Sequence, residues 1–228
     1  MNQFIVVPET TLPSGLVVPS FNYGKYLCSK GSDGKVAVTA DGAPWVNINF
    51  AEAKTACEES GFSLVTETQE LAIRHNAAQQ DANWTKGKVG EGKLFRGLRK
   101  GNVSSAQPGT FQSPDAKERR ILTLSNGEQV VDLNGNAFTW VFDDVQGTAD
   151  GLTGKIAADS ISLTTAPYPS LEKGMGWRPD GERNWSGHAL IRGGCWLSDS
   201  SAGVFHLGNG SPGRRYDNVG FRCTTKGL

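Results

Sequence analysis

The sequence predicts a loop-rich α+β domain in which two helices lie around small antiparallel sheets. Glycine is abundant, with 29 among 228 residues, and long helical periodicities are scarce. Two stretches combine a capping residue with a helical hydrophobic pattern, and short alternating runs are bounded by turn residues. A chain of this length supports one substantial core, so we expect a single main domain over residues 21–228.

Residues 1–20 are expected to form a short extended arm. Pro8, Pro13 and Pro19 interrupt every apolar run, and no basic region precedes them, so the start is not typical of a signal peptide. We therefore expect the protein to be made in the cytoplasm. The arm could pack against a neighbouring subunit, attach to a larger particle, or be a disordered leader.

Residues 21–45 are predicted to form a small β unit. Turn residues at 32–34 and 40–42 flank the short alternating run of residues 35–39.

The first helix is predicted to begin after Asn49, which can cap it, with Glu52 three positions later. Phe50, Ala53 and Cys57 would share its buried face. The helix should stop at Gly61.

The second helix is predicted to begin after Thr66, which forms a capping box with Gln69. Leu71, Ala72 and His75 would face the core, and His75 is interpreted as a packed, hydrogen-bonded residue rather than a ligand.

Two irregular stretches follow, at residues 86–114 and 146–186, and loops this long are usually functional or held by packing. Trp177 and Trp185 are expected to pin the second stretch beside the C-terminal segment. Asp143 and Asp144 are adjacent on a predicted strand and so point in opposite directions. They indicate a solvated turn or a Ca²⁺ ligand patch, and no other cofactor is expected.

Charge and cysteine usage exclude several classes of function. The 23 basic and 23 acidic residues balance, which argues against nucleic acid or an anionic membrane as the main partner. We expect neither nucleic-acid binding nor membrane insertion. Cys28, Cys57, Cys195 and Cys223 allow three paired connectivities and show no C-x-x-C spacing, so reduced thiols are expected.

The C-terminal segment, residues 192–223, has the most unusual composition. The chain contains 33 Lys, Glu, Gln and Met residues, and none of them lies in this segment. Ser, Gly, Asn, Asp, Tyr, Arg and His fill it instead, as in adaptable binding loops. The composition favours binding over chemistry, although a glycine-rich loop that merely lacks long side chains is the alternative.

Four blocks in series resemble the formylglycine-generating-enzyme (sulfatase-modifying-factor) superfamily, a variant of the C-type lectin fold. They are Gly61-x-x-Leu64-x-Thr66-Glu67, the stretch Asp132 to Val141 with Gly135-Asn136 and Trp140, Arg192-Gly193-Gly194, and Val219-Gly220-Phe221-Arg222. The family's Arg-Leu-Pro-Thr-Glu form is only partly kept, as Ser63-Leu64-Val65-Thr66-Glu67.

Residues 201–207 and Pro212 resemble one branch more specifically, the variable proteins of diversity-generating retroelements, which include the phage major tropism determinant. In that branch adenines are randomised, typically in AAC or AAT codons, which then never encode Lys, Glu, Gln, Met or Trp. Trp196 is the segment's one member of this set, and it belongs to the fixed frame.

The second resemblance implies a ligand-binding patch on a rigid frame. The frame would contain residues 202–205, with Phe205 inward, and Leu207, and Arg192 and Arg222 would bond loop carbonyls. Tyr216 and the two arginines beside it would be the energetic anchors. The implied ligand-binding residues are Leu197, Ser198, Asp199, Ser201, His206, Gly208, Asn209, Ser211, Arg214, Arg215, Tyr216, Asp217 and Asn218, with Cys195 and Gly213 as further candidates.

The expected ligand is a host-surface protein or carbohydrate, bound by a phage or prophage protein. Several copies, as a homo-oligomer or attached to a virion through residues 1–20, would supply avidity. A fixed structural or adhesin subunit is the alternative.

An enzyme is the third alternative. The family's copper oxidase needs two thiolates, which would fall on Ser198 and Gly203, and neither supplies one. His75, His188 and His206 lack metal-ligand spacing. We therefore expect no catalytic or metal-binding residues.

The resemblance also implies one contact. Val219, Phe221 and Cys223 share a strand face, and C-type lectin folds place the first helix against the last strand. Cys57 and Cys223 should therefore be adjacent, and reduced if the protein is used straight from the cytoplasm.

Overall fold

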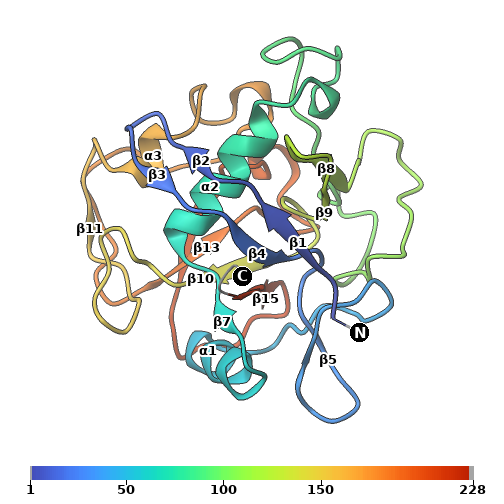
Figure 1. Cartoon of the computed structure of the whole chain (residues 1–228), viewed down its shortest axis with the longest axis vertical. Helices are drawn as coiled ribbons and strands as arrows, with labels where there is room; N and C mark the ends of the chain where they lie inside the picture. The colour runs from blue at the N-terminus through green and yellow to red at the C-terminus, as the bar shows by residue number, and fades with distance from the viewer. Residues whose placement is uncertain (1, 226–228) are drawn as a thin grey trace.

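Two four-stranded sheets and two principal helices build the domain in a computed structural model that describes residues 2–225 (Figure 1). The first sheet has the order β1-β4-β16-β7 and the second the order β14-β13-β10-β15, and four two-stranded ribbons lie around them. The predicted α+β architecture is confirmed. One pairing differs from the expected antiparallel arrangement, because β10 and β15 run parallel.

The strands are β1 (Phe4–Val7), β2 (Thr10–Thr11), β3 (Val17–Val18), β4 (Phe21–Gly24), β5 (Ser29–Lys30), β6 (Val36–Ala37), β7 (Ser63–Leu64), β8 (Ile121–Thr123), β9 (Gln129–Val131), β10 (Phe138–Val141), β11 (Lys155–Ile156), β12 (Arg183–Asn184), β13 (Ala189–Arg192), β14 (Leu207–Gly210), β15 (Val219–Phe221) and β16 (Cys223–Thr225). The helices are α1 (Phe50–Glu59), α2 (Glu67–Ala78) and the single turn α3 (Ile161–Thr164), with 3₁₀ turns at Asp81–Asn83, Glu172–Gly174 and Asp199–Ser201. No helix within residues 2–225 has the length and apolarity needed to cross a membrane.

Helix α1 follows the predicted pattern. Asn49 accepts a hydrogen bond from the Glu52 amide while Glu52 accepts one from the Asn49 amide, which completes a capping box. Phe50, Ala53 and Cys57 are its buried residues. The chain leaves the helix through Gly61, whose positive φ of 78° suits glycine.

Helix α2 begins at the predicted Thr66–Gln69 capping box. It is buried on nearly all sides, and the carboxylates of Glu67 and Glu70 lie inside the protein. His75 is half-buried as expected, but its Nδ1 has no hydrogen-bond partner among the described residues, so the predicted hydrogen bond is absent.

The first residues of the chain pack against their own domain. Strand β1 pairs with β4 along its whole length (Figure 1), and Ile5 and Val7 join the core around α2. The stretch expected to be an arm is therefore extended, as predicted, but it packs as part of the domain. Its exposed apolar side chains are Val6, Leu16 and Val17.

Buried arginines connect the elements through backbone carbonyls. Arg222 donates to the carbonyls of Gly24, Val131 and Asp132 at 2.5–2.9 Å. Arg192 donates to those of Phe205 and Ser162 at 3.2 and 3.1 Å. These contacts confirm the predicted frame roles.

Arg192 also forms an ion pair with Glu67 of α2, with Nε 3.0 Å from Oε2, and both side chains are fully buried. The sequence did not predict this pair. It ties α2 to β13, one of the two inner strands of the second sheet.

Three cysteines form a buried thiol cluster. The Sγ atoms of Cys57 and Cys223 are 2.7 Å apart, which confirms the predicted adjacency, and the Sγ of Cys28 lies 3.4 Å from that of Cys223. All are free thiols, and burial raises the pKa of both Cys57 and Cys223.

Candidate binding surface

The C-terminal segment alternates between a buried frame and two exposed loops. Strands β13, β14 and β15 belong to the second sheet, and the residues that connect them include both buried and exposed positions. Trp196, Ala202, Val204, Phe205 and Leu207 are buried, with Trp196 only 3% exposed. We call residues 197–201 loop A and residues 211–218 loop B.

Most of the expected patch residues lie in these two loops. Leu197, Asp199, Ser211, Arg214, Arg215 and Asp217 are exposed, whereas Ser198, Ser201, Asn209, Tyr216 and Asn218 are half-buried. Leu197 is the most open large apolar side chain of the described chain, at 65% exposure.

Two of the expected patch residues, His206 and Gly208, are buried instead of facing solvent. His206 is 6% exposed and its Nδ1 donates to the Ser201 carbonyl at 2.6 Å. Burial lowers its pKa to about 4, so the ring is neutral near pH 7. The candidate Cys195 is likewise buried against Trp196, whereas the candidate Gly213 is exposed.

Loop A is held by hydrogen bonds at its base. Ser198 Oγ accepts from the Cys195 amide at 2.8 Å, and the Asp199 amide donates to the Arg99 carbonyl at 2.8 Å. Arg96 Nη1 donates to the Ser200 carbonyl at 3.1 Å. The loop therefore rests on residues 96–99, within a stretch that the sequence identified only as irregular.

Loop B rests on β10 and on the start of α1. The Tyr216 ring packs 5.8 Å from that of Trp140, and its hydroxyl accepts from the Ser211 amide at 3.1 Å. The guanidinium of Arg214 lies 5.1 Å from the Tyr216 ring centroid. Arg214 forms no ion pair with the described residues, and its charge lies over the Tyr216 ring.

Loop B meets Phe138 and Cys195, two residues before the start of loop A. The Phe138 amide donates to the Asn218 carbonyl at 2.9 Å, and the Asn218 side chain reaches Cys195 Sγ, 3.5 Å away. Trp177 lies against His206, is 38% exposed, and donates its backbone amide to the Ser201 carbonyl. Its predicted position beside this segment is confirmed, and it adds an exposed aromatic to the surface. Trp185 packs against a hydrophobic cluster that contains Leu190 of β13 and Leu207 of β14.

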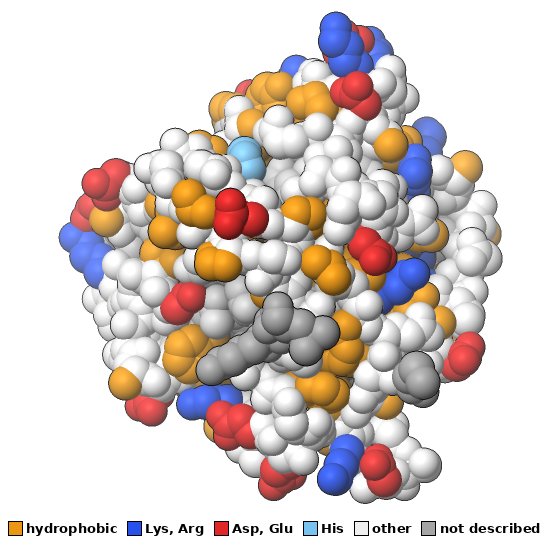
Figure 2. All heavy atoms as spheres, viewed as in Figure 1, with side chains coloured by type: hydrophobic (Ala, Val, Ile, Leu, Met, Phe, Trp, Pro, Cys, Tyr) orange, Lys and Arg blue, Asp and Glu red, His pale blue; other side chains and the backbone are white. Residues whose placement is uncertain are grey.

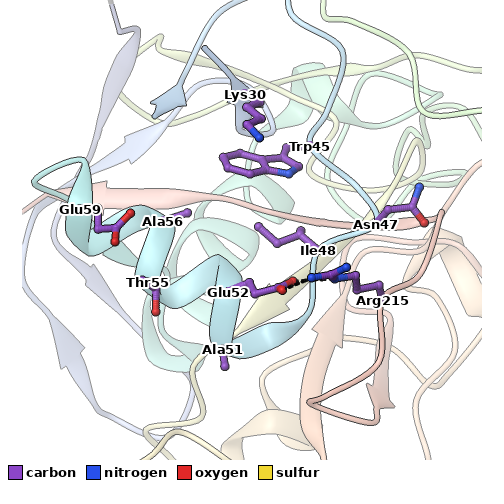
Figure 3. A pocket seen from close by; sticks show the side chains of 10 residues that line it. All are labelled: Lys30, Trp45, Asn47, Ile48, Ala51, Glu52, Thr55, Ala56, Glu59 and Arg215. Atoms are coloured by element: carbon purple, nitrogen blue, oxygen red, sulfur yellow. Dashed lines mark hydrogen bonds and ion pairs between the residues drawn. The ribbon is translucent and has the colours of Figure 1, made fainter. Parts of the chain in front are cut away.

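A groove of about 550 Å³ flanks loop B between Trp45 and the outer side of α1 (Figure 3). The Lys30 ammonium lies 5.0 Å from the Trp45 ring centroid. At the other end, Arg215 forms a bidentate ion pair with Glu52 (Figure 3). The hydrogen bond from Arg215 contributes most to lowering the pKa of Glu52 to about 2.

The described residues contain no group of three or more His, Cys, Asp or Glu side chains placed to hold a metal ion. Asp143 is buried and accepts hydrogen bonds from the Val145 and Gln146 amides, so it is not the solvated residue we predicted. Exposed Asp144 accepts from the Thr68 amide. Figure 2 shows acidic and basic side chains scattered over the visible face, with no large area of one charge.

The model of the sulfatase-modifying factor enzyme 1-like domain matches residues 24–226. The chain belongs to this family. No curated protein sequence matches it significantly.

Solved structures share this family fold at low sequence identity. Treponema denticola variable protein 1 is 16% identical, with a TM-score of 0.51 over 100% of this chain and 92% of that one. CarF is 10% identical, with a TM-score of 0.50 over 100% of this chain and 99% of that one. The P3c variant of the major tropism determinant is 14% identical over 96% of this chain and 52% of that one, with a TM-score of 0.46.

The family includes enzymes, so the two positions at which the family oxidase would carry thiolates matter. Ser198 lies in loop A, and its hydroxyl accepts a hydrogen bond from the Cys195 amide. Gly203 is packed so closely that a Cβ there would lie 2.3 Å from the Gly176 nitrogen. A cysteine side chain would not fit at residue 203 without moving the backbone.

Proposed function

We propose that this protein binds a ligand and performs no catalysis, and that loops A and B form a diversified recognition surface. The protein would be encoded by a phage or prophage, and its ligand would be a host-surface protein or carbohydrate. Mixed donors and acceptors beside exposed aromatic rings suit either kind of ligand.

One observation carries the proposal: the buried and exposed positions of the C-terminal segment separate into a frame and two loops. The loops are attached largely through backbone groups, such as the Asn218 carbonyl bonded by Phe138 and the Pro212 carbonyl bonded by Phe50. Side chains at positions such as Leu197, Arg214 and Asp217 can therefore change without loss of an internal contact on which the fold depends.

The oxidase alternative lacks its chemistry in these residues. Cys195 is the segment's cysteine nearest to loop A, and it is buried in an apolar cluster with Leu27 and Trp196. The other three cysteines belong to a different cluster around α1 and β16. A pair of thiolates suited to Cu(I) is not assembled beside loop A.

A fixed structural or adhesin subunit is the second candidate. It is favoured by the internal contacts of three loop side chains: Arg215 with Glu52, Tyr216 with Trp140, and Asp199 with Arg99. A surface that never varies could keep all three.

Multivalent display is part of the proposal, since one loop surface of this size gains avidity from repetition. Val6, Leu16 and Val17 are exposed near the start of the chain and offer a contact for a second copy or a virion. The protein would be made in the cytoplasm and act on a virion.

Deep sequencing of the 3′ end of the gene in a propagated population tests diversification. We expect substitutions at codons of exposed loop residues and none at Trp196, Val204 or Phe205. An invariant segment would contradict diversification and favour the fixed subunit.

Binding is tested separately by exposing host cells to the labelled protein. Arg214→Ala/Asp217→Ala should lose binding, whereas Lys35→Ala, an exposed change in the turn between β5 and β6, should not. Equal binding by the parent protein, the double variant and Lys35→Ala would contradict a recognition role for loop B.

A further inference from the structure

A second pocket lies behind loop A, and its charge is of one sign. It encloses about 440 Å³, and its charged lining residues are Lys93, Arg96, Arg99 and Lys117. The other lining residues are Thr85, Leu94, Phe95 and Ala116, so no carboxylate lines it.

Arg99 is the buried member of this cluster. It is 8% exposed, and its Nε has no hydrogen-bond partner among the described residues. Its Nη1 lies 3.4 Å from Asp199 Oδ1, a weak contact to a carboxylate that is itself largely exposed. A buried guanidinium with an unused N–H is costly unless an acceptor reaches it.

Arg96 adds a second guanidinium beside the first. It donates to the Ser200 carbonyl at 3.1 Å and to the Ala202 carbonyl at 3.4 Å, so it has no carboxylate partner among its hydrogen bonds. Burial and then the charge of Arg99 lower the pKa of Arg96. The two cations therefore repel each other inside a partly enclosed site.

The acidic groups around the pocket are engaged elsewhere. Asp115 forms an ion pair with Lys100. Glu118 accepts hydrogen bonds from the backbone amides of Arg99 and Lys100 and from Ser113. Among residues 2–225, only Asp199 forms an ion pair with a guanidinium of the pocket, which leaves an excess of positive charge.

We propose that this pocket binds a phosphate or sulfate group. Guanidinium groups donate in a planar fork that matches the oxygens of a tetrahedral oxyanion, and lysines add charge at the open side. Arg96 and Arg99 supply the inner donors, including the unused Nε–H of Arg99. The assignment does not depend on diversification of loops A and B.

The site lies directly against loop A, because both arginines bond that loop or the residue that follows it. An anion bound there would stand beside the recognition surface. The ligand class is thus a phosphorylated or sulfated molecule, or the free oxyanion.

The groove in Figure 3 provides a matched comparison. It also contains two cations, Lys30 and Arg215, but Glu52 and Glu59 line it too, and Arg215 is paired with Glu52. Oxyanions should therefore not accumulate in that groove.

The test titrates the full chain with inorganic phosphate, inorganic sulfate, methyl phosphate and methyl sulfate at constant ionic strength, with chloride as the reference. Calorimetry gives the affinity, and ¹H–¹⁵N spectra of the arginine Nε–H groups report the site. We expect saturable binding of at least one oxyanion, with a shift of the Arg99 Nε–H signal. Tighter binding of the methyl esters would identify a group carried on a larger molecule, and tighter binding of the inorganic ions would identify the free oxyanion.

Variants separate the pocket from general charge. Arg99→Gln should weaken binding by about tenfold or more, the loss of one charge-assisted contact. Lys93→Gln/Lys117→Gln removes two positive charges from the pocket and should weaken binding about fivefold. Both residues are exposed, so Tm should not change. This variant therefore tests the proposal even if Arg99→Gln does not fold. Lys30→Gln/Arg215→Gln should bind like the parent.

Saturation no stronger than for chloride, or equal weakening by the control pair, would overturn the proposal. Neither result bears on receptor recognition by loops A and B, which the sequencing and cell-binding experiments address.

Discussion

Replacement of Arg192 by methionine should destabilise the fold more than any exposed change in the C-terminal segment. Arg192 is fully buried, pairs with Glu67 through two nitrogens and donates to two carbonyls. Removing one partner of a buried ion pair leaves an uncompensated charge and costs about 3–5 kcal/mol. For a domain of this size each kcal/mol lowers Tm by about 2–4 °C, so we expect a fall of about 6–20 °C.

Urea denaturation followed by tryptophan fluorescence and circular dichroism measures this cost. Glu67→Leu/Arg192→Met removes both charges and should recover most of the loss, because apolar replacement of a buried pair is often neutral. Arg215→Met is the matched control in the same segment. It breaks an exposed pair with Glu52, and such pairs contribute about 1 kcal/mol or less.

A loss below about 1 kcal/mol in Arg192→Met would refute the reasoning, since a buried charge could not be left unpaired so cheaply. So would a double variant whose loss equals the sum of the two single losses. That result would mean that Glu67 and Arg192 act independently.

Further predictions concern the frame, the pH response, the thiols and the loops. Trp196→Ala should cost about 3–5 kcal/mol in urea denaturation because the ring is buried, and parental stability would contradict its place in the frame. The pKa of His206 is about 4 in the fold against the usual 6.5. The unfolded chain therefore binds a proton that the native state lacks, and stability should fall by about 3 kcal/mol as pH drops from 6.5 to 4. His206→Asn should flatten that fall, and an unchanged pH profile would exclude His206 as its source. Thiol titration after denaturation should find four free thiols. Oxidation of the native protein with diamide should lower the count by two without forming a dimer, because Cys57 or Cys28 can form a disulfide with Cys223. Loss of two thiols in Cys223→Ser as well would contradict a disulfide at Cys223. Arg214→Ala should leave Tm unchanged. Tyr216→Ala should cost about 1–2 kcal/mol because it loses the contact with the Trp140 ring, and a melting curve equal to that of the parent would show that this contact does not stabilise the fold.

The sequence predicted the local features best. Both capping boxes, at Asn49 and Thr66, follow from residues three positions apart, and such patterns require no knowledge of the rest of the fold. The Cys57–Cys223 contact was within reach because strand alternation and the family resemblance place one residue against the other. Cys28 was missed because its position depends on a loop whose backbone bonds to Phe221.

The candidate surface was predicted less completely, for two physical reasons. Composition identifies the segment as unusual, but it does not tell which of its residues are buried. His206 is covered by Phe138 and Trp177, and Gly208 lies against Ile191, and these contacts depend on the tertiary fold. The proposed oxyanion pocket combines Arg96 and Arg99, from the stretch 86–114 that the sequence presents only as irregular, with Lys117 from beyond that stretch. The sequence shows that the two arginines are three residues apart, but it does not show that both line one cavity, because that depends on the tertiary fold.

The hydrogen bonds from buried arginines to loop carbonyls have a consequence for mutational tolerance. Every residue type offers the same carbonyl, so the bonds from Arg74 to Val204, from Arg192 to Phe205 and from Arg222 to Asp132 do not depend on the side chains of the residues they hold. Arg96 treats Ser200 in loop A in the same way. Selection on these bonds acts on the few cationic donors: exposed Ser200 can change its side chain at little cost to folding yield, whereas Val204 and Phe205 stay constrained by their own packing in the core.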